Sequence, residues 1–172
     1  MVLYLYFIYV YFMRRMTDKD LMLSVVGAFL ATLMASFFSN TLLEAEHLPV
    51  ILASTGASAM LIFGLPMAEV SQPWNLVGGH IISAFVGVSC YQLIPNILLA
   101  SSLCIPLSML FMHYCKCMHP PGGATAITAI IGGSNIHALG YMYIILPVFV
   151  NAIIILSVAM SVATVRDENP FT

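Results

Sequence analysis

Long apolar runs separated by short polar segments dominate this chain of 172 residues. Four runs approach the length of about 20 residues that a helix needs to cross about 30 Å of hydrocarbon. Two others are shorter and rich in small residues. This pattern predicts an all-α, polytopic membrane helix bundle of six segments, of which the second and fifth are short: residues 21–43, 48–64, 76–94, 97–114, 122–133 and 141–165.

The two short runs contain similar stretches. Thr55-Gly56-Ala57-Ser58-Ala59 in the second run is echoed by Gly122-Gly123-Ala124-Thr125-Ala126 in the fifth. The chain therefore divides twice into long, short and long, which predicts two three-helix repeats of inverted topology, a common design of transporters. An alternative stays open, because glycine, alanine and serine are also ordinary packing residues of membrane helices.

Composition supports a membrane protein and excludes an ordinary soluble domain. Hydrophobic residues make up 61% of the chain, charged residues 7%, and the mean hydropathy is +1.01, whereas soluble domains carry about 25% charged residues. We expect an apolar, aromatic N-terminal tail over 1–16, a transmembrane domain over 17–166 and a short C-terminal tail over 167–172.

Charge placement predicts the orientation of the bundle. If all six segments cross, one side receives every lysine and arginine of the chain: Arg14, Arg15, Lys19, Lys116 and Arg166. The positive-inside rule then places both termini in the cytoplasm. If the short segments instead enter and return, Lys116 moves to the opposite side.

The segment between the fourth and fifth runs reads His119-Pro120-Pro121-Gly122-Gly123-Ala124-Thr125. Two prolines suit the first turn of a helix, and glycines allow another group to approach the backbone. A helix that starts this way is expected to present unpaired N–H groups and a positive dipole end, which suits a small anion. The predicted substrate-binding residues on this side are His119, Pro120, Pro121, Gly122, Gly123 and Thr125.

His80 is the most deeply placed ionisable residue of the long runs. An ionisable group inside the membrane is a functional candidate by default, although a neutral histidine bonded to a neighbouring helix is an equal alternative. With Gly79 beside it, and with Gly56 and Ser58 in the second run, His80 is predicted to form the opposite side of an anion site.

A second kind of chemistry is suggested by Cys115, Cys117, Met118 and His119. Thiolates, a thioether and an imidazole are ligands for Cu(I) or Zn, but this set lacks the second cysteine pair of a closed structural site. Nucleotide-binding and nucleophilic-catalysis motifs are absent from the sequence. We therefore expect no enzyme, no cofactor and no nucleic-acid partner.

The signature at 119–126 strongly resembles that of the HPP family of integral membrane proteins. The likeness extends through Gly56-Ala57-Ser58-Ala59, Gln72-Pro73, Asn75-Leu76-Val77-Gly78-Gly79-His80 and Leu146-Pro147-Val148. The resemblance implies a membrane domain that is usually described as four-spanning. It also implies transport, because plant members are linked to nitrite movement across the chloroplast envelope.

Together these features predict a permease or channel for a small inorganic anion, most simply nitrite, bound between the N-termini of the two short helices near the midplane of the bilayer. The expected setting is a bacterial inner membrane, with a homo-oligomer possible. The alternatives are a soft-metal-binding membrane protein and a non-transporting subunit or scaffold.

Overall fold

A computed structural model describes residues 16–43, 49–166 and 171 of the chain. This part is all-helical and contains no strand. Its elements, in chain order, are α2 (Asp18–Leu43), α3 (Pro49–Gly64), η1 (Glu69–Ser71), α4 (Pro73–Leu93), α5 (Ile97–Tyr114), α6 (Gly122–Ile131), α7 (Ser134–Leu139), η2 (Ile144–Phe149) and α8 (Val150–Val165).

Four of the helical stretches are long and apolar enough to cross a membrane: Asp18–Leu42, Pro73–Leu93, Ile97–Tyr114 and Ile144–Val165. The helices α3 and α6 are apolar but shorter, as the sequence predicts. The four-spanning description of the family and the six runs of the sequence are therefore compatible, because they differ only in how α3 and α6 are counted.

Local sequence accounts for the helix ends. The Thr17 hydroxyl accepts a hydrogen bond from the Asp20 amide at the start of α2, and the Asn96 side chain caps α5 through the Leu99 amide, both standard N-caps. Pro73 occupies the first turn of α4, where a missing N–H costs nothing. The helix is interrupted just before Pro147, where Leu146 has non-helical backbone angles (φ −126°, ψ 113°).

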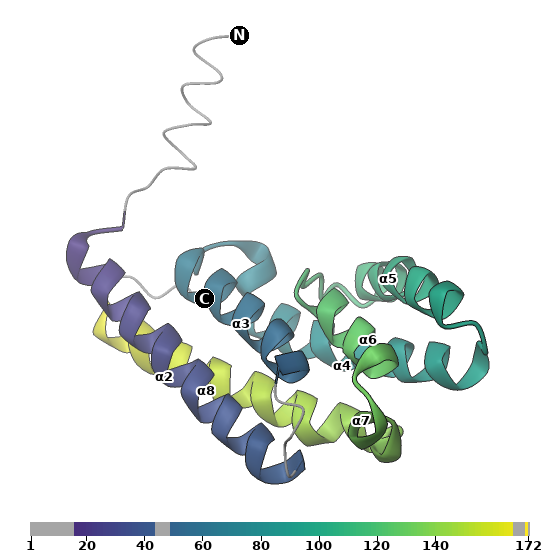
Figure 1. Cartoon of the computed structure of the whole chain (residues 1–172). Helices are drawn as coiled ribbons and strands as arrows, with labels where there is room; N and C mark the ends of the chain where they lie inside the picture. The colour runs from purple at the N-terminus through teal and green to yellow at the C-terminus, as the bar shows by residue number, and fades with distance from the viewer. Residues whose placement is uncertain (1–15, 44–48, 167–170, 172) are drawn as a thin grey trace, which may run out of the picture.

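Neighbouring long helices run antiparallel. Arg166, after the end of α8, donates a hydrogen bond to the Asp20 carbonyl near the start of α2. At the other end of this pair, Asn151 Nδ2 lies 2.8 Å from Ser39 Oγ. In the same way the start of α4 meets the end of α5, where the Trp74 indole donates to the Cys115 carbonyl. Figure 1 shows α2 and α8 side by side, with α6 lying between α3, α4 and α5.

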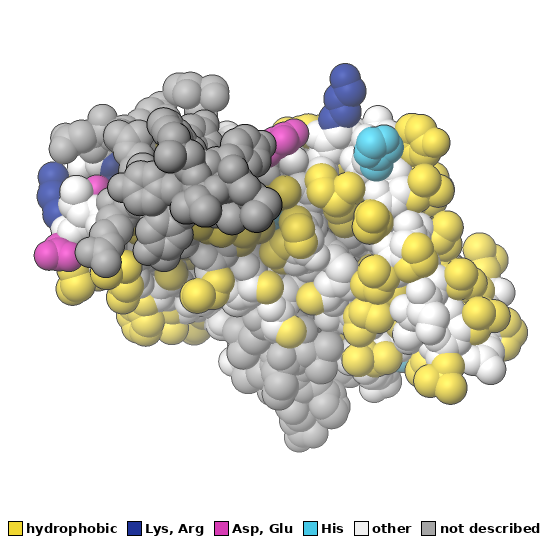
Figure 2. All heavy atoms as spheres, turned by 90° about the horizontal axis from the view of Figure 1, so that it is seen from above, with side chains coloured by type: hydrophobic (Ala, Val, Ile, Leu, Met, Phe, Trp, Pro, Cys, Tyr) yellow, Lys and Arg dark blue, Asp and Glu magenta, His cyan; other side chains and the backbone are white. Residues whose placement is uncertain are grey.

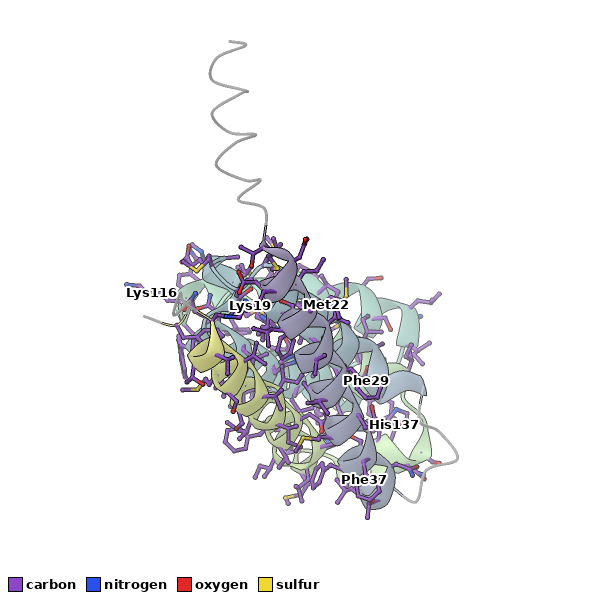
Figure 3. All side chains as sticks on the ribbon, turned by 90° about the vertical axis from the view of Figure 1, so that its left-hand side faces the viewer. Lys19, Met22, Phe29, Phe37, Lys116 and His137 are labelled. Carbon is purple, nitrogen blue, oxygen red and sulfur yellow. The ribbon has the colours of Figure 1, made fainter. Side chains whose placement is uncertain are left out.

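Apolar side chains cover the outside of the bundle. Along α2, Met22, Phe29 and Phe37 are 62%, 63% and 72% exposed, and Figure 3 shows them following one another along that helix. Figure 2 shows hydrophobic side chains spread over the described part of this face, with the few visible charged groups towards its margins. Such a surface suits lipid rather than water, since a soluble monomer rarely exposes apolar patches of this extent.

Candidate functional site: a buried histidine–hydroxyl centre

Four of the predicted site residues meet at the centre of the bundle. Ser58 comes from the middle of α3, His80 from α4, His119 from the segment before α6, and Thr125 from α6. Ser58, His119 and Thr125 are completely buried and His80 is 4% exposed. These residues come from four separate segments of the chain, so tertiary packing rather than local sequence assembles the centre.

Short polar contacts connect the four side chains. Ser58 Oγ lies 2.8 Å from His80 Nε2 and 3.0 Å from His119 Nε2, so this hydroxyl bridges the two imidazoles. His80 Nδ1 lies 2.7 Å from Thr125 Oγ1. His119 Nδ1 lies 2.8 Å from the Val70 carbonyl oxygen of η1. Both nitrogens of each ring therefore have a hydrogen-bonding partner, as buried polar atoms require.

Close backbone packing holds His119 against α4. A Cβ on Gly79 would lie 2.5 Å from His119 Cβ, and a Cβ on Gly122 would lie 2.6 Å from Ser83 Oγ. Any larger residue at either position would push the signature segment away from α4. These two predicted site glycines thus act as packing surfaces that bring the histidines together, with their ring centroids 5.0 Å apart.

A small cavity of about 10 Å³ adjoins His80 and Thr125. This volume accommodates about one water molecule. The walls are polar where α3 and α6 contribute to them, whereas α8 contributes one amide, Asn151, and two apolar side chains. They are formed by Ser54, Thr55, His80, Thr125, Tyr143, Pro147, Val148, Asn151, Ala152 and Ile155.

Two of these cavity residues were not anticipated from the sequence. The buried Asn151 Oδ1 atom has no hydrogen-bond partner among the described residues, and Tyr143 donates a hydrogen bond from its hydroxyl to the Thr125 carbonyl. A third missed group is the Val70 carbonyl, which bonds to His119. The signal for Asn151 is visible in retrospect, because it is an amide inside the apolar run 141–165.

The start of α6 differs from the expected anion site. The first three amides after the prolines are already bonded, since Gly122 N donates to His119 O, Gly123 N to Pro120 O and Ala124 N to Pro121 O, over 2.9–3.1 Å. The expectation of unpaired N–H groups is therefore wrong. The physical reason is that the prolines begin a tight turn whose carbonyls satisfy the orphan donors of the helix.

The N-termini of the short helices also do not converge. The Ser58–His119 contact joins the middle of α3 to the start of α6, whereas Ala53 and Thr128, nearer the start of α3 and the end of α6, line a common groove. The two helices are thus antiparallel (Figure 1). The first residue of α3, Pro49, lies nine positions before Ser58, about 14 Å along the helix at 1.5 Å per residue.

The remaining predicted residues lie away from the buried centre. Pro120 and Gly123 line a wide, mainly apolar groove of about 660 Å³ between α3, α5 and α6. Within the part of the chain that the structure describes, a Cβ on Gly56 would meet no atom within 4 Å. Pro121 is buried as the residue that precedes α6. The structure therefore brings together the side chains of Ser58, His80, His119 and Thr125, and not Gly56, Pro120 or Gly123.

The soft-metal alternative finds no support in the arrangement of its side chains. Within the described residues there is no group of three or more His, Cys, Asp or Glu side chains placed to hold a metal ion. Cys115 is exposed, whereas Cys117 is buried with its Sγ 3.2 Å from a Cβ placed on Gly78. His119, the fourth member of the proposed set, already has both ring nitrogens engaged.

Electrostatically the centre favours neutral imidazoles. His119 lies between α5 and α6, outside the four membrane-crossing stretches. Burial lowers its pKa to about 4, and the hydrogen bond to the Val70 carbonyl opposes part of that effect. A neutral centre binds polar groups through hydrogen bonds and presents no permanent charge to attract an ion.

Comparisons with known proteins agree with the resemblance in the sequence. The model of the HPP transmembrane region matches residues 13–171. The chain is 34% identical over 143 residues to two Dictyostelium discoideum proteins, Transmembrane protein DDB_G0269096 and Transmembrane protein DDB_G0273707/DDB_G0273361. These alignments cover 76% and 81% of this chain but 50% and 46% of the relatives, so the chain spans about half their length. No solved structure matches. The chain belongs to the HPP transmembrane family.

Proposed function

We propose that this protein is a permease for a small inorganic anion, and that the anion passes through the buried histidine–hydroxyl centre. The observation that carries this proposal is the position of four linked polar side chains in the middle of an apolar helix bundle. Polar and ionisable residues at such depth are costly and typically belong to a solute or proton pathway. Nitrite is the first candidate substrate because of the family resemblance in the sequence.

We further propose that the bundle consists of two inverted units, α2–α3–α4 and α5–α6–η2/α8. Helix contacts support this division when α2, α3 and α4 are matched with α5, α6 and α8. The contact of α2 with α3 then corresponds to that of α5 with α6, and the contact of α2 with α8 corresponds to that of α5 with α4. In the same way, the contact of α3 with α8 corresponds to that of α6 with α4. In the aligned stretches of the sequence Ser58 corresponds to Thr125, and both hydroxyls contact the same imidazole, His80. A substrate site at the interface of two such repeats is typical of secondary transporters.

The described structure corresponds to a closed state of this proposed permease. Its cavity has room for about one water molecule, which is less than nitrite requires. Transport therefore needs the walls to separate, and the irregular segment η2, which contributes Pro147 and Val148 to the cavity, lies directly at that wall. Alternating separation on the two sides would give each face access in turn.

The orientation that we propose follows the positive-inside rule. Lys19 at the start of α2, Lys116 after α5 and Arg166 after α8 belong to one end of the bundle, and His137 belongs to the other; Figure 3 labels Lys19, Lys116 and His137 at these ends. This arrangement favours a cytoplasmic position for the lysine-bearing end. The bacterial inner membrane stays a prediction, to which the Dictyostelium relatives add no support.

Anion uptake into proteoliposomes tests the proposed function. Purified protein is compared with protein-free vesicles and with His119→Ala, using nitrite, nitrate, chloride and formate. We expect saturable uptake of at least one anion and its loss in His119→Ala. The matched control is Ser102→Ala, because Ser102 is exposed and bonds only back to the Leu98 carbonyl of its own helix.

Uptake at the protein-free rate for every anion, by protein with a cooperative melting transition, would contradict the proposal. That outcome would favour the non-transporting subunit or scaffold, and the next experiment would then be co-purification with a second chain.

A further inference from the structure

We propose that the anion crosses together with one proton, which the His80–Ser58–His119 chain carries while the anion is bound. This inference rests on the proposed transport function and specifies its energy coupling. It follows from the direction of the hydrogen bonds in the buried centre, which the geometry fixes without reference to any solute.

The direction of these hydrogen bonds is set at the Val70 end of the hydrogen-bonded series. A carbonyl oxygen can only accept, so His119 Nδ1, 2.8 Å away, must be the nitrogen that carries a proton. In a neutral imidazole the other nitrogen, His119 Nε2, is then an acceptor. Its partner at 3.0 Å, the Ser58 hydroxyl, must therefore donate to it.

The remaining bonds follow from this first one. Because Ser58 has a single hydroxyl proton and gives it to His119, its oxygen must accept from His80 Nε2 at 2.8 Å. His80 Nδ1 is then an acceptor, and the Thr125 hydroxyl at 2.7 Å donates to it. The neutral centre thus has one consistent pattern, in which every donor points from Thr125 towards Val70.

One added proton changes this pattern in a defined way. If it binds His80 Nδ1, His80 becomes an imidazolium, and the bonds from Ser58 to Val70 stay as they are. If the charge instead resides on His119, the Ser58 proton has moved to His119 Nε2 and the His80 Nε2 proton has replaced it on the Ser58 oxygen. In both states His80 Nδ1 carries a proton and donates to Thr125, so exactly one proton has entered and no bond other than N–H and O–H has changed.

Protonation therefore prepares the cavity for an anion. The Thr125 hydroxyl, released from His80, is free to donate into the adjoining cavity, which Thr125 and His80 both line. At the same time a positive charge is created beside that cavity. A partly desolvated anion is bound by charge-assisted hydrogen bonds of this kind more strongly than by neutral ones.

The surroundings of the two imidazoles couple the binding of the proton to the binding of the anion. The titratable groups that face the two imidazoles are Tyr143 in the cavity wall and Cys117 near Gly79, both neutral in their usual state, while Glu69 beside Val70 is exposed. The polar side chains that line the cavity from α3 and α8 are the hydroxyls of Ser54 and Thr55 and the Asn151 amide. Among the residues that the structure describes, these contacts include no carboxylate and no other basic side chain. Burying a single ion there is therefore costly, whereas burying a proton and an anion together costs much less. By linkage each ion then raises the affinity for the other.

Driving-force experiments in proteoliposomes test this coupling. The protein is reconstituted into vesicles, and two driving forces are compared. One is a pH gradient, acid outside, at zero membrane potential, and the other is a membrane potential at equal pH. Co-transport of one proton per monovalent anion is electroneutral, so we expect accumulation of about tenfold per pH unit of gradient and no response to potential.

The outcomes separate the coupling from the function. Accumulation that follows the membrane potential and ignores the pH gradient would overturn the coupling but leave the permease intact. Absence of any uptake by folded protein would overturn both. Protein-free vesicles measure the background flux of the undissociated acid, and nitrate serves as the anion for which that background is smallest.

A spectroscopic measurement tests the hydrogen-bond pattern without transport. In protein labelled with ¹⁵N-histidine, assigned by single His→Gln variants, we expect His119 as the Nδ1–H tautomer and His80 as the Nε2–H tautomer at pH 7. An Nε2–H tautomer at His119, or unchanged spectra on adding anion at pH 5, would overturn the proposed chain.

Discussion

The two short helices, α3 and α6, contribute matching hydroxyls to one imidazole but are held very differently. α6 is packed against α4 so closely that a Cβ on Gly87 would lie 2.5 Å from the Ala126 carbonyl. On α3, by contrast, a Cβ on Gly56 or Gly64 would meet nothing within 4 Å. The comparison teaches that α6 presses its backbone against α4, whereas these two glycines of α3 face open space and α3 packs through its other face, where Ser58, Ala59 and Ile62 are buried.

The largest expected effect comes from adding a methyl group at the close contact between α4 and α6. Gly87→Ala places a carbon against backbone that cannot rotate away, and we expect a loss of about 3 kcal/mol in unfolding free energy. The matched control is Gly56→Ala, which should be neutral or stabilise by about 0.5–1 kcal/mol, because alanine favours helix. Thermal melting in detergent measures both. Equal destabilisation by the two changes would remove the contrast between α3 and α6.

The next effect concerns the two matching hydroxyls. Ser58→Ala leaves one nitrogen of each histidine without a partner, whereas Thr125→Val leaves only His80 Nδ1 unpaired. An unsatisfied buried group costs about 1 kcal/mol or more, so we expect the unfolding free energy to fall by about 2 kcal/mol in Ser58→Ala and by about 1 kcal/mol in Thr125→Val.

Melting temperatures of these two variants should be compared with Ser102→Ala, whose side chain bonds only to its own helix. If Thr125→Val costs as much as Ser58→Ala, the serine is not the bridge between the two rings.

A smaller effect is expected from pH. The pKa of His119 is lowered from an ordinary 6.5 to about 4 in the folded protein. Between these values the unfolded chain binds a proton that the folded chain does not, so stability falls as pH falls from 6.5 towards 4. We expect a lower melting temperature at pH 5 than at pH 7, a smaller difference in His119→Gln, and partial recovery at pH 5 when anion is added. A melting temperature that rises on acidification would contradict a neutral buried His119.

The smallest effect is expected at the exposed cysteine. Cys115→Ser changes a side chain on the surface and should alter stability by less than about 0.5 kcal/mol. Anion uptake should also be unchanged. Loss of uptake in this variant, together with wild-type uptake that depends on added Zn²⁺ or Cu(I), would revive the soft-metal alternative.

Much of the fold follows from the sequence because membrane helices must satisfy their own backbone. Runs 21–43, 97–114 and 122–133 agree with α2, α5 and α6 within a few residues. His80 was also predictable, since an ionisable group inside a membrane run is rare and costly, and His119 was predictable from its position at the head of the Pro-Pro-Gly-Gly segment.

What the sequence does not reveal depends on packing between helices. The Val70 carbonyl joins the site only because η1 folds over His119, and Asn151 only because α8 passes beside α4. The amides after the two prolines seemed free in the sequence, whereas in the structure the preceding turn satisfies them. These are relations between distant segments, to which hydropathy and motif spacing are insensitive.

The central claim is that the hydroxyl of Thr125 takes part in moving the anion. The most direct test is uptake by Thr125→Val and Thr125→Ser in the same proteoliposomes, because valine keeps the shape and serine keeps the hydroxyl. We predict that Thr125→Ser transports within about threefold of the wild type and that Thr125→Val falls at least tenfold, about 1.4 kcal/mol. Wild-type uptake by a folded Thr125→Val protein would contradict the account, because the buried centre would then be structural and the anion would take another path.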